Sequence, residues 1–192
     1  MKTEFEATFV NIVRSSLTGS LRQAGAKLVR PEYVQRRVIL QLPKEKRADD
    51  TWLRVRDEGD KVTLTLKSID GKTITGQKEI LLVVHDFMVT IALLESIGCE
   101  KKSYQESKRE LWVLDNVEIA IDTWPFLEPY VEVEGASEAA VKGVVKKLNL
   151  NYAEAIFDTV NAIYEQKYGK TIEELNQSVV KNFVFNMKNP FL

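Results

Sequence analysis

Residues 52–67 read WLRVRDEGDKVTLTLK, and this stretch decides the fold class. Polar and apolar side chains alternate on both sides of the turn Asp57-Glu58-Gly59-Asp60, which is typical of a β-hairpin. Residues i and i+2 of a strand share a face, so Arg54 and Arg56 point one way and their apolar neighbours point the other. After the turn, Thr63, Thr65 and Lys67 share a face in the same manner. The hairpin therefore predicts an antiparallel sheet with a polar, partly cationic face.

Other segments repeat this alternation along most of the chain. Strands are predicted over about residues 4–9, 35–42, 52–57, 61–67, 78–84, 103–114, 117–122 and 130–134. Helices are predicted over about residues 13–24, 86–97, 138–148 and 152–168. A capping box at 171–174 predicts one more helix, and the apolar segment at 183–187 packs either on the sheet or on a partner. Strands that are mostly adjacent in sequence, with helices inserted, indicate an α+β fold.

The charged face of the predicted sheet is sorted by strand. The acidic group comprises Glu4, Glu6, Asp122, Glu132 and Glu134, and the basic group comprises Arg37, Arg54, Arg56, Lys67 and Arg109. Alternation of polar and apolar residues in an antiparallel sheet commonly indicates only that one face is exposed to solvent. A solvent-exposed face, however, gives no reason for acidic and basic residues to be sorted by strand. A closed eight-stranded barrel explains it, with helices packed outside and the charges lining a tunnel. A divalent cation on the carboxylates and a phosphate chain on the cations would satisfy both groups. The alternative is a structural barrel whose charges pair with one another.

Length and composition bound the function. A chain of 192 residues favours one main domain, and 44% apolar and 29% charged residues are ordinary for a globular protein. The 27 Lys+Arg against 28 Asp+Glu give a charge of −1, which provides no overall attraction for nucleic acid or an anionic membrane. The single cysteine Cys99 and the single histidine His85 argue against a disulfide framework or a histidine-rich zinc site. There is no long apolar run and no signal peptide, so we expect a cytoplasmic protein.

The ordered motifs resemble the CYTH superfamily, the triphosphate tunnel metalloenzymes. They are Glu4-x-Glu6, Leu53-Arg54-x-Arg56, Leu64-Thr65-Leu66-Lys67, Arg109 before Trp112, Ile121-Asp122 and Val131-Glu132-Val133-Glu134. The resemblance implies a tunnel domain over residues 1–170, followed by a C-terminal helix and tail over 171–192. It also implies Mg²⁺ or Mn²⁺ as cofactor, with Glu4, Glu6, Asp122, Glu132 and Glu134 as metal ligands. It further implies that Arg37, Arg54, Arg56, Lys67 and Arg109 bind the triphosphate, and that Glu4, Glu6, Arg54, Arg56 and Lys67 act in catalysis.

One departure from the family pattern bears on activity. The third position of the first-strand signature Glu-x-Glu-x-Lys is Thr8 in this chain. The resemblance implies attack within a bound triphosphate. We favour hydrolysis of an inorganic or organic triphosphate, such as tripolyphosphate, ATP or thiamine triphosphate, because hydrolysis needs no nucleoside pocket. The alternatives are class IV adenylyl cyclisation of ATP, and a tunnel that binds a triphosphate or nucleotide with low activity because the lysine is missing. We expect a monomer or homodimer. Trp124 is expected at the rim of the barrel, and Tyr130 in the core.

Overall fold

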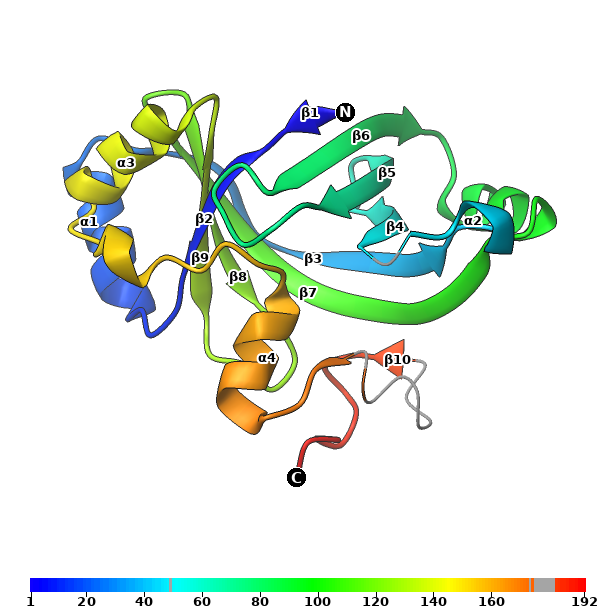
Figure 1. The fold of residues 1–192 in the computed structure, drawn as a ribbon. Coiled ribbons are helices and arrows are strands. Elements are labelled where there is room, and N and C mark those ends of the chain that lie inside the picture. The colour runs from blue at the N-terminus through cyan, green and yellow to red at the C-terminus, as the bar shows by residue number, and fades with distance from the viewer. Residues whose placement is uncertain (49, 173, 175–181) are drawn as a thin grey trace.

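A computed structural model describes residues 1–48, 50–172, 174 and 182–192 (Figure 1). The strands are β1 Lys2–Thr3, β2 Phe5–Phe9, β3 Lys27–Gln41, β4 Thr51–Asp57, β5 Val62–Ile69, β6 Gln77–Val84, β7 Glu100–Leu114, β8 Val117–Thr123, β9 Tyr130–Gly135 and β10 Asn182–Phe183. The helices are α1 Arg14–Gln23, α2 Phe87–Ser96, α3 Glu138–Lys147 and α4 Val160–Tyr168, with 3₁₀ turns at Lys44–Lys46 and Tyr152–Glu154. None of the described helices is both long and apolar enough to span a membrane.

The sheet comes round on itself through its N-terminal segment. Neighbouring strands follow the order β1-β6-β5-β4-β3-β7-β8-β9-β2, so the two ends of the path are β1 and β2, consecutive in the chain. Lys2 and Thr3 pair with β6, whereas Phe5–Phe9 pair with β9. Glu4 stands between them, and its N–H donates to the carbonyl of Gln77 at 3.0 Å. With β1 and β2 counted as one interrupted strand, the described path passes eight antiparallel strands, which confirms the predicted barrel.

The strand registers place the charged residues of neighbouring strands opposite one another around the barrel. Arg37 of β3 lies opposite Arg56 of β4, and Arg56 lies opposite Thr63 of β5. On the far side, Glu6 of β2 lies opposite Glu134 of β9. Because residues paired across antiparallel strands point to the same face, these charged residues all face the interior.

Helices cover much of the apolar outer surface. Leu17 and Leu21 of α1 and Val141 of α3 join a core with the outward residues of β2, β8 and β9. In Figure 1 these two helices lie together on one side of the barrel and α2 lies at the other end. Helix α2 contributes Ile91 to a smaller core with outward residues of β3 and β4.

The outer face of β6 differs from the expectation that helices cover the apolar side of the sheet. Ile80 and Leu82 point outward from β6 and remain 46% and 55% exposed. Among the described residues, the covering helices thus stop short of this strand.

The helix predicted over residues 152–168 is wrong as a single element. Ile156 interrupts it, because its backbone N–H and C=O pair with Thr8 at 2.9 and 3.1 Å. A new helix begins after Thr159, whose hydroxyl accepts from the N–H of Asn161. The competing partner is distant in sequence, so local helical periodicity could not reveal the break.

The C-terminal segment packs on the barrel. β10 runs parallel to β7, off the barrel path, and buried Phe183 makes an edge-to-face contact with Tyr164 of α4. The predicted capping box is present, because the side chains of Thr171 and Glu174 each accept from the other residue's backbone N–H. The helix predicted to follow it lies largely outside the described residues. The domain boundary near residue 170 stays a prediction.

Candidate functional site

A cavity of about 990 Å³ occupies the interior of the barrel. All ten residues proposed from the sequence line it: Glu4, Glu6, Arg37, Arg54, Arg56, Lys67, Arg109, Asp122, Glu132 and Glu134. They come from β2, β3, β4, β5, β7, β8 and β9 and from the link at Glu4, so only closure of the barrel brings them together.

Three arginines from β3 and β4 form a cationic wall. Burial, followed by the charges of Arg56 and Arg37, lowers the pKa of Arg54 to about 9. Burial and the neighbouring Arg56 lower the pKa of Arg37 to about 10. Arg37 donates to Gln35 Oε1 at 2.8 Å and to Ser107 Oγ, and its guanidinium lies 4.4 Å from the ring centre of Trp124. The wall therefore holds cations that repel one another in a buried place.

Several buried donors on this wall have no hydrogen-bond partner. Among the described residues they include Nε of Arg37, Arg54 and Arg56 and the hydroxyls of Thr63 and Thr65. The registers place Thr63 opposite Arg56 and Thr65 opposite Arg54. A buried polar group without a partner costs about 1–3 kcal/mol, and the three arginines of this set line the cavity, so an anion bound there would offset part of this cost.

Lys67 forms the second cationic position. Its Nζ donates to Glu4 Oε2 at 2.9 Å and to Gln77 Oε1 at 3.4 Å. Burial acts to raise the pKa of Glu4, but the charge and hydrogen bond of Lys67 outweigh it and lower that pKa. Glu79 of β6 lies opposite Lys67, and burial together with the charge of Glu4 raises its pKa.

Arg109 binds two of the proposed metal ligands directly. Its Nε donates to Asp122 Oδ1 at 2.7 Å, and its NH2 group lies 2.5 Å from both Asp122 Oδ2 and Glu132 Oε2. Despite burial, the two carboxylates raise the pKa of Arg109. Arg109 is thus paired with Asp122 and Glu132, so a proposed phosphate ligand contacts two proposed metal ligands in this state.

Three carboxylates of the acidic group, Glu6, Glu132 and Glu134, have raised pKa values, and burial is the main cause in each. Burial raises the pKa of Glu134 to about 7, with Glu4 and Glu118 adding to the shift. Burial and the charge of Glu6 raise the pKa of Glu132 to about 8. Burial also raises the pKa of Glu6, partly offset by Lys67.

This donor set fits a hard divalent cation in its chemistry. It contains carboxylate oxygens only, which are the ligands that Mg²⁺ and Mn²⁺ prefer. In the described part of the chain, no three Asp, Glu, His or Cys side chains converge closely enough to hold a metal as they stand. An ion would therefore have to draw Glu6 and Glu134 together, and its positive charge would oppose the effect of burial, which is the main cause of their raised pKa values.

Thr8 stands at the position where the family pattern Glu-x-Glu-x-Lys has lysine. It is buried, with 3% of its surface exposed, and lies opposite Glu132 in the β2–β9 ladder. Its backbone also pairs with Ile156, so Thr8 stands where β9 and the segment before α4 meet.

Sequence reasoning missed several residues of the site. Glu79 and Gln77 line the cavity from β6, and their alternation with outward residues could have placed them there. Trp124 and Tyr130 also line the cavity while belonging to a buried cluster, so they are wall residues as well as core. Glu58 supports the site from outside the cavity lining and pairs with Arg56 at 2.7 Å. A turn motif gave no signal that its acidic side chain would be buried.

The sequence and fold are similar to known proteins. The sequence pattern of the CYTH domain matches residues 12–162. Comparison with curated proteins finds no match. A protein from Pyrococcus horikoshii OT3 has a similar structure, with TM-score 0.68 and 20% identity over 81% of this chain and 96% of that one.

Two further solved structures share the fold. One is a candidate adenylate cyclase from Vibrio parahaemolyticus, with TM-score 0.74 and 10% identity over 85% of this chain and 98% of that one. The other is a candidate adenylyl cyclase from Hippeastrum described as having a dominant triphosphatase activity, with TM-score 0.57 and 12% identity over 90% and 98% of the two chains.

Proposed function

The chain belongs to the CYTH domain family, and on that premise we propose that it is a metal-dependent enzyme that hydrolyses a triphosphate inside the barrel. The observation that carries this proposal is the set of buried donors without partners on Arg37, Arg54 and Arg56, which line the cavity. A phosphate chain has acceptor oxygens on every phosphorus and can satisfy guanidinium and hydroxyl donors in one binding event.

The cationic wall would bind and orient the substrate. Arg54 and Arg56 stand two residues apart on β4, about 7 Å along the strand, so their guanidinium groups can contact neighbouring phosphates. Lys67 lies beside Glu4 and would bring a positive charge to the boundary between the two halves of the site.

The acidic half would hold the cofactor. Glu6 and Glu134 are the ligands that we favour, with Glu4 and Glu132 beside them, and Asp122 held by Arg109. A bound Mg²⁺ or Mn²⁺ supplies neutralisation of the charge that develops on phosphate oxygens. Glu132, with a pKa of about 8, can hold or release a proton near neutral pH.

Cyclisation of ATP is the second candidate. The observation that favours it is the aromatic and apolar part of the cavity, where Trp52, Trp124 and Leu81 line the wall. A nucleoside would bury its base against such side chains. A cavity of about 990 Å³ has room for more than a phosphate chain alone.

Product analysis distinguishes these reactions. Purified protein is incubated with tripolyphosphate or ATP, each with Mg²⁺ and with Mn²⁺, and phosphate and cyclic AMP are measured. Phosphate from tripolyphosphate supports the proposed hydrolysis. Formation of cyclic AMP from ATP, with no phosphate released from tripolyphosphate, would reject hydrolysis and support the cyclase reaction. Metal-dependent binding with no product from either compound would reject the proposal that the protein is an enzyme. It would indicate that the barrel only binds a triphosphate or nucleotide.

A further inference from the structure

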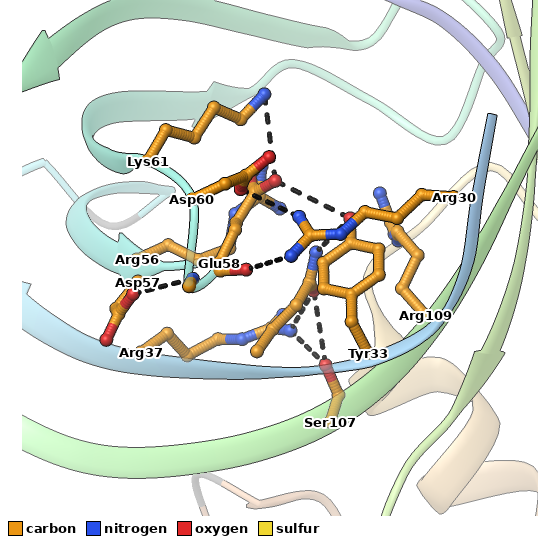
Figure 2. Close-up of polar contacts among 12 residues, drawn as sticks. Arg30, Tyr33, Arg37, Arg56, Asp57, Glu58, Asp60, Lys61, Ser107 and Arg109 are labelled. Atoms are coloured by element: carbon orange, nitrogen blue, oxygen red, sulfur yellow. Dashed lines mark hydrogen bonds and ion pairs between the residues drawn. The ribbon is translucent and has the colours of Figure 1, made fainter.

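Glu58 is a buried carboxylate that contacts Arg56 of the cationic wall (Figure 2). It belongs to the turn between β4 and β5 and is only 4% exposed. It does not belong to the cavity lining, whereas its neighbours Arg56 and Lys61 do. The metal and phosphate assignments above make no use of it.

The backbone of the turn fixes the position of Glu58. Its N–H donates to the carbonyl of Lys61 at 3.0 Å, and its own carbonyl accepts from Arg30 at 2.7 Å. Arg30 also pairs with Asp60 at 2.7 Å and stacks over the ring of Tyr33, 3.5 Å from the ring centre. Gly59 provides the positive φ of 89° that the turn requires. The backbone of Glu58 is therefore held by contacts that do not involve Arg56.

The carboxylate of Glu58 lies close to two cations, Arg56 of the cationic wall and Lys61. Oε1 lies 2.7 Å from the NH2 group of Arg56, and Oε2 lies 3.6 Å from Nζ of Lys61. The hydroxyl of Tyr33 donates to Oε2 at 3.5 Å, and the charge of Glu58 adds to the effect of burial in raising the pKa of Tyr33. An anionic oxygen thus already occupies part of the face that Arg56 can offer to a phosphate.

We propose that Glu58 is a resident counter-anion, which stabilises the empty tunnel and weakens its affinity for phosphate chains. This inference rests on the proposed function, because it assumes that Arg56 binds phosphate. Without an anion, the three wall arginines repel one another in a buried place, and Glu58 offsets part of that repulsion. With a phosphate bound, Glu58 and the phosphate compete for Arg56, and this competition favours release of the phosphate. Glu58 therefore sets affinity and the release of product, while a purely structural role in the turn would set stability alone.

Glu58→Gln isolates this charge effect. Glutamine has nearly the same shape and keeps an acceptor oxygen for Arg56, so the variant removes the negative charge with little change in packing. The matched control is Asp115→Asn, in the hairpin turn between β7 and β8. It also removes a carboxylate charge, but Asp115 is exposed and pairs with Lys147, away from the cavity lining.

The test measures the Kd of tripolyphosphate by calorimetry without divalent ions, together with thermal unfolding of the free protein. Placing like charges side by side typically costs more than 1.4 kcal/mol in a desolvated site, so we expect Glu58→Gln to bind about ten-fold tighter. We also expect a lower Tm for the free variant, and in turnover a lower KM without a higher kcat. Asp115→Asn should keep the Kd of the unmodified protein. In an Arg56→Ala background, most of the gain from Glu58→Gln should disappear.

The outcomes separate this inference from the proposed function. Unchanged or weaker binding by a folded Glu58→Gln variant, while the unmodified protein binds tripolyphosphate, overturns the counter-anion role alone. A gain that persists undiminished without Arg56 also overturns it. Absence of binding in the unmodified protein and in both variants overturns the proposed function and the inference together.

Discussion

Lys67 Nζ lies 2.9 Å from Glu4 Oε2, and this contact ties β5 to the residue at which the N-terminal segment passes from β6 to β9. Both side chains are nearly buried, with 11% and 6% exposed. The same pair stands where the cationic wall meets the carboxylates that could hold a metal. The ion pair thus adds a side-chain contact where the backbone ladders of β1 and β2 close the barrel, and it lies where the two halves of the site meet.

Lys67→Ala should destabilise the protein by about 3–5 kcal/mol, because it leaves the Glu4 carboxylate buried without its partner. The double variant Lys67→Met with Glu4→Gln should recover much of that loss, since neither side chain then carries a charge. Denaturant unfolding measures both changes. If Lys67→Ala alone matched the unmodified protein, the pair would have no part in closing the barrel.

Arg54→Ala should weaken tripolyphosphate binding by about 10- to 100-fold, which corresponds to the loss of one charged hydrogen bond. A matched control is available on β3, where Arg37 points into the cavity and its neighbour Arg36 is exposed on the opposite face. Arg37→Ala should weaken binding in a similar way, whereas Arg36→Ala should not. Calorimetric titration compares the three variants. Equal affinity of Arg54→Ala and the unmodified protein would remove the phosphate role of the wall.

The stability of the metal-free protein should fall as the pH rises. The pKa values of Glu134 and Glu132 in the folded protein, about 7 and about 8, lie above their ordinary value of 4.5. The folded state therefore binds more protons than the unfolded state between these values. The associated stability is fully present below about pH 4.5 and is lost as the pH rises through about 7 and 8.

Divalent metal should reverse that loss. Mg²⁺ or Mn²⁺ binds ionised carboxylates in the folded state, so it should raise the Tm more at about pH 8 than at about pH 6. Glu134→Gln should reduce both the pH dependence and the metal effect, whereas Glu95→Gln on the exposed face of α2 should change neither. Thermal unfolding across the pH range gives the result. A Tm that is independent of metal at every pH would argue against the carboxylates as its ligands.

Thr8→Lys should raise turnover, because an ammonium at this buried position would stand opposite Glu132 and add a cation to the interior. The larger side chain must fit beside the Ile156 segment, so we also expect a loss of about 1–3 kcal/mol in stability. Initial rates with tripolyphosphate, alongside unfolding, check both effects. Lower turnover in a folded variant would indicate that Thr8 belongs to a different working arrangement of the site.

The sequence predicted the members of the site because the polar face of each strand repeats every second residue. Arg54 with Arg56, and Glu132 with Glu134, needed only this periodicity to be placed on one face. The partners of these residues were not predictable in the same way. Arg109 binds Asp122 and Glu132 through the registers of β7, β8 and β9, which depend on how the barrel closes.

Long-range contacts account for the other differences. The single helix expected over 152–168 breaks because Ile156 pairs with Thr8, almost the whole chain away. Glu58 read as a turn residue, and its burial follows from Arg30, which reaches the turn from β3. Local sequence patterns could not predict either contact, because each contact joins segments that meet only in the folded barrel.

The most direct test of the central claim is calorimetric titration of tripolyphosphate into the metal-free protein at low ionic strength. The account predicts that one tripolyphosphate binds per protein molecule. Added salt should weaken this binding, and Arg54→Ala should weaken it strongly. Binding would satisfy the buried donors of the cationic wall and raise the Tm of the protein. Absence of binding by the folded, unmodified protein would contradict the account, because the interior charges would then serve only one another.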